Sequence, residues 1–379
     1  MSRCRQIGCA NPASQHRFGR RARQLLEDAR DGVAEILGAD LFGPAPDRVL
    51  FTSGGTEANN LALLGLAAAA ERIADGSHEA VISPIEHPSI AAAAQELERR
   101  GWHIRRLPVT REGVVDISAL PDMITRRTRS ISMMLGNNET GVLQPVAEAA
   151  AIASECGVPL HTDAVQVVGK LPVNFRALGV STLSLAAHKF HGPVGIGALI
   201  VRGGTTLEPI LWGGFQQAGL RPGTQPVALA VGLHAALAAW RREARERAHR
   251  FGTLRDRLER GLQAAYPDLV INGVGAPRLP HTSNVSLVGL DRRALAMAFD
   301  LAGVACSTGS ACASGSSEPS PVLLAMGCDA EVVGSSIRFS LGVDTTIDEI
   351  DEAVRRAADV CQQLMRAKAA TGRTAIQAR

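Results

Sequence analysis

The hydrophobic pattern between residues 18 and 245 alternates between two periods. Short apolar runs typical of buried strands occur at 48–51, 80–83, 102–107, 129–135, 158–161, 180–186 and 195–201. Segments with helical spacing of apolar residues lie at 18–37, at 58–72 and from Pro88 to Gly101. Strands that alternate with helices predict an α/β domain with a mostly parallel sheet flanked by helices.

The pattern changes after this region. A long helical stretch is predicted at 225–263, with a break near Gly252. Strands at 284–288 and 336–341 then mix with helices at 291–301, 319–326 and 346–368, which predicts a smaller α+β domain. We therefore divide the chain into an N-terminal segment 1–15, a large domain 16–250 and a small domain 251–379.

Composition narrows the class of protein. Of 379 residues 46% are hydrophobic and 20% charged, which is ordinary for a globular protein. The basic stretch 241–260 alternates with acidic residues at a helical period, so it predicts a solvated helix face rather than a nucleic-acid site. The longest apolar run, 61–70, is shorter than the roughly 20 residues that span a bilayer. The seven cysteines form no CxxC pair and no secretory signal is recognisable, so we expect a cytoplasmic protein with reduced thiols, without a metal site.

Lys189 is one of only three lysines, with Lys170 and Lys368. It follows an apolar run and precedes a Gly-Pro turn, so we expect its amine at the end of a buried strand, where desolvation lowers the pKa of a lysine. Asp163 ends a neighbouring strand. A carboxylate and a lysine so placed are what pyridoxal phosphate (PLP) needs, one to hold the ring nitrogen protonated and one to bind the aldehyde covalently.

Other strand ends carry groups with two interpretations each. The Gly-rich turn 52–57 is either a phosphate site or a plain loop capped by threonine. Asp163 and Gln166 either contact the ring nitrogen and phenolic oxygen of the cofactor or form a turn. His87 either stacks on the ring or caps a helix, and the 137–141 segment either binds ligand or makes a turn. Together they predict a ligand site at one edge of the sheet.

The segment 310–321 has no bulky apolar side chain, so we expect a mobile loop that exposes Cys312 as a reactive thiol. Cys306 ends an apolar run and is expected in a strand of the core. Structural roles are favoured for Cys156, Cys328 and Cys361. Arg338 either clamps a carboxylate or decorates a surface strand.

The chain resembles the cysteine desulfurases, fold-type-I PLP enzymes of the class-V aminotransferase superfamily, from about Asn11 to Glu352. The long Cys312 loop is similar to that of the group I form. The motifs that carry the resemblance are Phe-Thr-Ser-Gly-Gly-Thr-Glu-Ala-Asn-Asn (51–60), Glu-His-Pro (86–88), Asn-Asn-Glu-Thr-Gly (137–141), His-Thr-Asp-Ala-Val-Gln (161–166), His-Lys-Phe-His-Gly-Pro (188–193), Arg-Pro-Gly-Thr (221–224), Ser-Thr-Gly-Ser-Ala-Cys (307–312) and Ile-Arg-Phe-Ser-Leu-Gly (337–342).

The resemblance implies that L-cysteine becomes L-alanine while its sulfur is kept as a persulfide on Cys312. The acceptor would be a scaffold or a tRNA-thiolation carrier, and the enzyme a homodimer that serves iron–sulfur cluster assembly or tRNA thiolation. The domains 16–250 and 251–379 would be the PLP-binding domain and the Cys312-carrying domain, and 1–15 a remnant of the small domain. The implied roles are catalysis by Lys189, Cys312 and His87, cofactor binding by Gly55, Thr56, Asn138, Asp163, Gln166 and His188, with Thr224 from the partner subunit, and binding of the substrate carboxylate by Asn138 and Arg338. The single metal contact would be a transient one with an iron–sulfur cluster at Cys312.

Three features depart from the family pattern. Ala186 replaces a serine that contributes to the phosphate site, Gly-Pro-Val-Gly (192–195) replaces Gly-Pro-Lys-Gly, and the N-terminal Asn-Asn-Ala-Thr-Thr strand is missing. Two other class-V enzymes, a selenocysteine lyase and a true aminotransferase, stay open as alternatives. The missing strand and Ala186 also leave open a non-catalytic PLP-binding partner protein.

Overall fold

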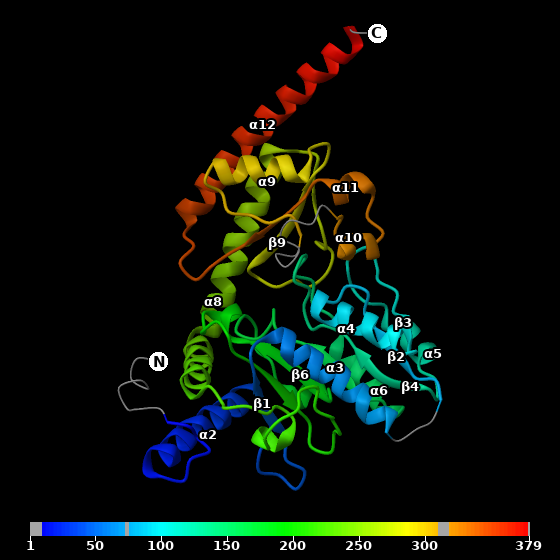
Figure 1. Ribbon diagram of the computed structural model, residues 1–379. Coiled ribbons are helices and arrows are strands. Elements are labelled where there is room, and N and C mark those ends of the chain that lie inside the picture. Colours follow the sequence, from blue (N-terminus) through cyan, green and yellow to red (C-terminus); the bar gives the residue numbers. More distant parts are fainter. Residues whose placement is uncertain (1–9, 73–75, 310–317, 378–379) are drawn as a thin grey trace. The chain divides into compact units, whose positions relative to one another are not determined.

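The computed structural model describes residues 10–72, 76–309 and 318–377. The chain divides into two compact units (Figure 1). The first contains the residues up to Pro108, Val115–Gly136 and Gln144–Ala244. The second contains Val109–Val114, Asn137–Leu143 and the chain from Arg245 onward.

The first unit is built on a seven-stranded sheet in the order β1-β7-β6-β5-β4-β2-β3. Strands β2 to β6 are parallel to their neighbours, and only β7 runs antiparallel to β6 and β1. The prediction of a mostly parallel sheet is therefore confirmed. The strands are β1 (Arg48–Thr52), β2 (Glu79–Ile82), β3 (His103–Arg106), β4 (Thr128–Ser132), β5 (Leu160–Asp163), β6 (Thr182–Ala186) and β7 (Gly197–Val201).

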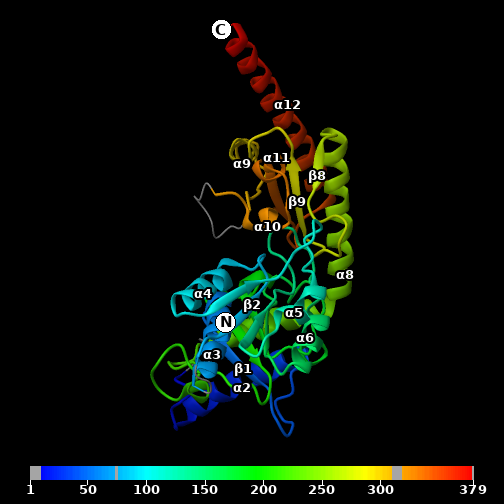
Figure 2. The same cartoon turned by 90° about the vertical axis from the view of Figure 1, so that its right-hand side faces the viewer.

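Helices cover both faces of this sheet. Figure 2 shows α3 and α4 on one side of the strands and α5 and α6 on the other. Helix α3 crosses the central strands, and its Leu61 and Leu66 pack with Leu50 and Leu199 of β1 and β7. The helical elements of this unit are α2 (Arg17–Leu37), α3 (Gly55–Glu71), α4 (Pro88–Arg99), η1 (Ile117–Ala119), α5 (Leu120–Met123), α6 (Val146–Glu155), α7 (Phe175–Leu178), η2 (Ala187–Phe190) and η3 (Gln216–Gly219).

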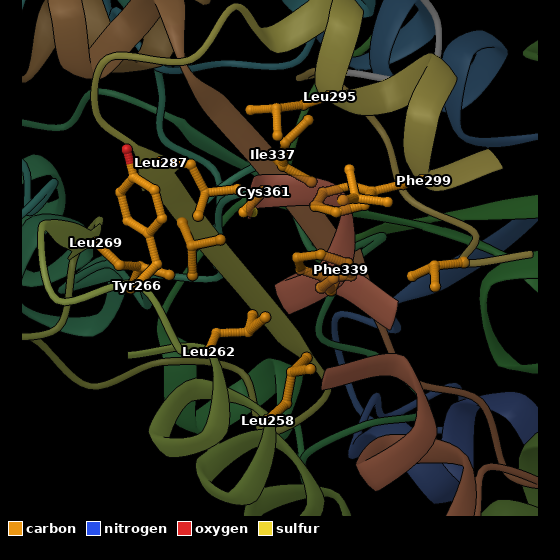
Figure 3. Packing of buried hydrophobic residues seen from close by; sticks show 14 of the residues in the cluster. Leu258, Leu262, Tyr266, Leu269, Leu287, Leu295, Phe299, Ile337, Phe339 and Cys361 are labelled. Atoms are coloured by element: carbon orange, nitrogen blue, oxygen red, sulfur yellow. The ribbon is translucent and has the colours of Figure 1, made fainter. Parts of the chain in front are cut away.

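The second unit has a three-stranded antiparallel sheet in the order β10-β9-β8. Its apolar core joins Phe299, Ile337 and Phe339 to Leu262 and Cys361 (Figure 3). The elements are β8 (Leu269–Ile271), β9 (Thr282–Leu287), β10 (Ser336–Ser340), α9 (Arg292–Leu301), α10 (Pro321–Ala325), α11 (Ala330–Gly334) and α12 (Ile347–Gln377).

The helix that connects the two units differs from the sequence-based expectation. Helix α8 (Val227–Ala265) runs without interruption through Gly252, where a break was predicted, and the unit boundary at Ala244 falls within it. A single glycine costs a helix only about 1 kcal/mol, which the flanking leucines Leu254 and Leu258 offset by packing in the core.

The division into units also differs in residues 137–143. The sequence boundary at 250 assigned them to the large domain, but they belong to the second unit. The reason is backbone pairing: Leu143 N–H donates to Pro277 O at 2.9 Å, and Leu279 N–H donates to Gly141 O at 2.7 Å. Residues 10–15 lie in the first unit, where Pro12 O accepts from Arg23 Nε at 3.0 Å, rather than with the small domain.

Among the described residues, no helix is long and apolar enough to cross a bilayer.

Candidate active site

The carboxyl ends of three parallel strands bring candidate residues together in the first unit. Asp163 is the last residue of β5, Lys189 lies in the short turn η2 after β6, and His87 follows β2. The ionisation of His87 is influenced by both Asp163 and Lys189, so the three groups lie close enough to interact electrostatically. Lys189 is only half-buried and lies in a 3₁₀ turn beyond the strand, so it is less desolvated than the sequence predicted.

Asp163 is held rigidly in the interior. Its side chain is 4% exposed, and each carboxylate oxygen has its own donor: Asn59 Nδ2 at 2.7 Å from Oδ2 and Val165 N at 2.9 Å from Oδ1. The turn interpretation and the functional one are thus compatible, because the bond to Val165 is a local Asx turn and leaves the carboxylate at the strand end. A fixed, buried carboxylate is suited to hold a pyridinium N–H. Gln166 lies in the following turn and is half-buried.

His87 is the N-cap of α4, as one of the two interpretations predicted. Its Nδ1 accepts the backbone N–H of Ser89 at 3.1 Å, and the imidazole is only half-buried. Burial lowers the pKa of His87, and Lys189 lowers it further, while Asp163 opposes both effects. The imidazole is therefore neutral near pH 7. Capping uses only Nδ1 of the ring, so the role as N-cap and a contact between the ring and a ligand are compatible.

The first turn of α3 has the geometry of an anion site. Gly54 is the N-cap and has no side chain to accept the N–H groups that follow. A Cβ on Gly55 would lie 2.8 Å from Val165 Cγ2, so the glycine lets the backbone approach the end of β5 closely. Thr56, on this turn, and His188, on η2, are both exposed. Free N–H groups at a helix N-terminus suit a phosphate, so the residues present fit the phosphate of PLP.

Ala186 lies at this cradle. Its Cβ would be 3.6 Å from a Cβ placed on Gly55, so the family's serine hydroxyl is missing beside the helix N-terminus. The side chain is fully buried, and the methyl group fills the position without a polar atom.

An ion pair fixes the segment that carries Thr224. Arg221 Nε donates to Glu57 Oε1 at 2.8 Å, which ties the Arg-Pro-Gly-Thr motif to the first turn of α3. Burial acts to raise the pKa of Glu57, but hydrogen bonds from Arg221 and Ser53 outweigh it and lower the pKa overall. Thr224 itself is exposed.

The second unit brings together the two residues expected to bind the substrate carboxylate. Arg338, on β10, donates from a terminal guanidinium nitrogen to the backbone oxygen of Asn138 at 2.8 Å. Asn138 is buried, and within the described residues its Oδ1 has no hydrogen-bond partner. An unsatisfied buried amide oxygen beside an arginine is typical of a polar site that awaits a ligand.

Cys312 lies outside the described residues. The described cysteines, Cys156, Cys306, Cys328 and Cys361, are free thiols. Cys306 is not in the expected strand. Residues 304–306 form a coil, and backbone pairing is limited to an isolated bridge between Ser307 and Arg338. The Cys306 side chain is only partly buried. Burial raises the pKa of both Cys306 and Cys361 to about 11. Within the described part of the chain no three metal-ligating side chains lie together.

Sequence reasoning missed three residues around Asp163 and His87. Asn59 is 1% exposed on α3, Ser89 is buried on α4, and Glu86 is buried directly before His87. The one available signal was the pair Asn59 and Asn60, two polar residues in the otherwise apolar stretch 58–70. Such a residue in a buried helix face needs partners, and only the fold shows which they are.

Comparison with known proteins places this site in a family. The sequence profile described as Aminotransferase class-V matches residues 6–353. Cysteine desulfurase IscS of Dictyoglomus turgidum is 41% identical over 341 residues, which cover 90% of this chain and 84% of the relative. The IscS-like cysteine desulfurase of Mycobacterium tuberculosis is 40% identical over 364 residues, with 93% and 91% covered.

Solved structures agree. A NifS-like protein has a TM-score of 0.85 at 32% identity and covers 94% of this chain and 92% of its own. The NifS-like protein from Rickettsia africae has a TM-score of 0.82 at 30% identity, with 92% and 91% covered. The chain therefore belongs to the aminotransferase class-V family, and within it to the cysteine desulfurases, which are PLP-dependent enzymes.

Proposed function

We propose that Lys189 binds the cofactor, that Asp163 holds its ring nitrogen, and that Cys312 takes sulfur from L-cysteine. The observation that carries this proposal is the gathering of Asp163, His87 and Lys189 at the carboxyl ends of β5, β2 and β6. When bound, PLP supplies an aldehyde for the substrate amine and a ring that withdraws electrons from its Cα. Gln166 and Asn138 would contact the cofactor, and the first turn of α3, with Gly55, Thr56 and His188, would hold its phosphate.

The protein's own groups then have separate tasks. The amine of Lys189 would move the Cα proton, and neutral His87 would cover the reacting centre and exchange protons there. Arg338 and Asn138 orient the substrate through its carboxylate. The fixed carboxylate of Asp163 stabilises positive charge at the ring nitrogen, and burial keeps water from competing for it.

The sulfur step requires one thiolate. Cys312 Sγ bonds to the substrate sulfur while the carbon–sulfur bond breaks, and the electron pair of that bond goes to Cβ, which takes up a proton. The products are L-alanine and a Cys312 persulfide, with no external oxidant. The high pKa of Cys306 and Cys361 makes them poor nucleophiles, and Cys156 follows α6 at the amino end of β5, the opposite end from Asp163. These observations support Cys312.

The test measures alanine and sulfide from L-cysteine with the PLP-loaded enzyme in dithiothreitol. Cys312→Ala is expected to abolish sulfide release, Lys189→Ala to abolish both products, and Cys156→Ala to change neither. Equal sulfide release from the Cys312→Ala and wild-type enzymes would contradict the assignment. Keto acid in place of alanine would favour an aminotransferase.

We further propose a homodimer in which Thr224 reaches the phosphate of the partner's cofactor. Trp212 and Phe215, in the segment before Thr224, are 85% and 87% exposed, and aromatic side chains so exposed favour burial at an interface. Trp212→Ser with Phe215→Ser is expected to give a monomer with weaker cofactor retention, measured by light scattering and absorbance. A wild-type monomer at micromolar concentration would contradict the proposal.

The sulfur acceptor is proposed to be a protein of iron–sulfur cluster assembly or of tRNA thiolation in the cytoplasm. The free thiols of the four described cysteines are consistent with a reducing compartment. Incubation of the enzyme, charged with radioactive sulfur, with a candidate scaffold and a candidate tRNA-thiolation carrier should label one of them, and loss of labelling in Cys312→Ala is the control.

A further inference from the structure

A chain of buried hydrogen bonds connects Asp163 to His87 through two residues of no assigned role. Asn59 Nδ2 lies 2.7 Å from Asp163 Oδ2 and 2.8 Å from Ser89 Oγ. Ser89 Oγ in turn lies 2.8 Å from His87 Nδ1. Asn59, Ser89 and Asp163 are buried, so water cannot substitute for the two bonds of Asn59, and the bond between Ser89 and His87 is partly buried.

The direction of each bond follows from its partners. A carboxylate only accepts, so the amide group of Asn59 that faces Asp163 is the NH₂, and its second hydrogen goes to Ser89 Oγ. The other side of the amide agrees, because Asn59 Oδ1 faces the hydroxyl of Ser184 and lies 3.2 Å from His161 Nε2. Burial lowers the pKa of His161 to about 3, so this ring is neutral and donates from Nε2.

Ser89 therefore donates to His87 twice. Its oxygen already accepts from Asn59, so its single hydroxyl hydrogen is available for Nδ1 of His87. Its backbone N–H donates to the same nitrogen at 3.1 Å. A nitrogen that receives two donors presents its lone pair and carries no proton. We propose that Ser89, oriented by Asn59, is a positioning residue that holds His87 as the neutral tautomer with its proton on Nε2.

This inference rests on the proposed placement of His87 at the reacting centre and adds which nitrogen can donate there. The charged groups that face the ring are Asp163 at the end of β5, which favours the protonated imidazole, and Lys189 after β6, which disfavours it. Asp163 alone would draw a second proton onto the ring. The two donors of Ser89 oppose this, because protonation of Nδ1 would break both bonds.

The tautomer is measured directly on the PLP-loaded enzyme without substrate. Long-range proton–nitrogen correlation spectra of protein labelled with nitrogen-15 in its histidines distinguish protonated from unprotonated ring nitrogens, and His87→Asn assigns the signal. We expect Nε2 protonated and Nδ1 unprotonated at neutral pH. A protonated Nδ1 overturns the proposal, whether or not the enzyme releases alanine. Absence of alanine with the expected tautomer would instead contradict the proposed function alone.

A matched set of variants tests the role of the hydroxyl. Loss of one neutral hydrogen bond in Ser89→Ala should raise the pKa of His87 by about half to one unit, and Ser89→Thr should restore it. The control is Ser83→Ala, a buried serine between β2 and α4, whose hydroxyl accepts from the Ile85 N–H. An unchanged pKa of His87 in Ser89→Ala, or an equal rise in Ser83→Ala, would show that the hydroxyl does not set the tautomer.

Discussion

Glu86 is expected to make the stability of the first unit fall as pH rises above 4.5, the ordinary pKa of a glutamate. Its carboxyl is fully buried beside His87, with Oε1 accepting from Met134 N at 2.8 Å. Within the described residues, Oε2 has no hydrogen-bond partner. Burial, and then the charge of Asp163, raise the pKa of Glu86 well above 4.5, against the hydrogen bonds from Met134 and Ser132. The folded protein therefore keeps this carboxyl protonated at pH values where the unfolded chain ionises it.

The magnitude follows from linkage. A group whose pKa is raised by folding contributes stability that is fully present below its unfolded pKa and is lost as pH rises toward its folded pKa. While Glu86 is protonated in the folded state and ionised in the unfolded one, each pH unit costs about 1.4 kcal/mol of unfolding free energy. Glu86→Gln keeps an acceptor for the Met134 N–H and cannot ionise, so its stability lacks this slope.

The assay is urea unfolding of wild type and Glu86→Gln at intervals from pH 5.5 upward. Trp102, Trp212 and Trp240 all lie in the first unit, so tryptophan fluorescence reports that unit. The control is Glu57→Gln. The pKa of Glu57 is lowered, so Glu57 is ionised in both states over this range and its difference from wild type should not depend on pH.

One result would refute the reasoning. If the unfolding free energies of wild type and Glu86→Gln run parallel from pH 5.5 upward, burial does not hold the pKa of Glu86 well above its ordinary value in the folded protein. A wild type that gains stability with rising pH relative to the variant would reverse the sign and lead to the same conclusion.

Three further outcomes are expected. Arg278 forms a bidentate ion pair with Glu259, and both side chains are under 10% exposed. Arg278→Met should therefore lower the unfolding free energy of the second unit by about 3–5 kcal/mol, because it leaves the Glu259 charge buried without its partner. The double variant Arg278→Met with Glu259→Leu should recover most of this loss, as measured by hydrogen exchange in β9. Cys361, whose pKa burial raises to about 11, should react with iodoacetamide at pH 8 at least about tenfold more slowly than exposed Cys156, and equal rates by mass spectrometry would contradict this. Asn59→Leu should lower the unfolding free energy by at least about 3 kcal/mol and weaken PLP retention, because it removes the hydrogen bonds that Asn59 makes to Asp163 and His161. A loss under about 1 kcal/mol would show that these hydrogen bonds contribute little to stability.

The sequence by itself determined the architecture of the first unit. Period-two and period-3.6 patterns are local, and each strand from β1 to β7 lies within a few residues of its predicted run. Motif spacing also identified the family, because residues that must meet a cofactor stand at the ends of those strands. Asp163 and Lys189 could be selected for this reason alone.

The limits of the elements were less predictable. Helix α3 begins at Gly55 rather than at Ala58, because its first turn is stabilised by Glu57, which accepts from Ser53 N at 2.7 Å and from Arg221. The short strand β8 has only three residues and carries no periodic signal. Such features depend on partners distant in sequence, which a local pattern does not contain.

Only the tertiary structure decided how the site is supported. Asn59, Ser89 and Glu86 come from α3, α4 and the segment between β2 and α4, and nothing in their own surroundings along the chain shows that they share partners. Their roles follow from hydrogen-bond direction and from burial, which exist only once the helices pack on the sheet and exclude water. The sequence thus selects the candidate groups at the strand ends, and the packed interior decides which buried partners each of them has.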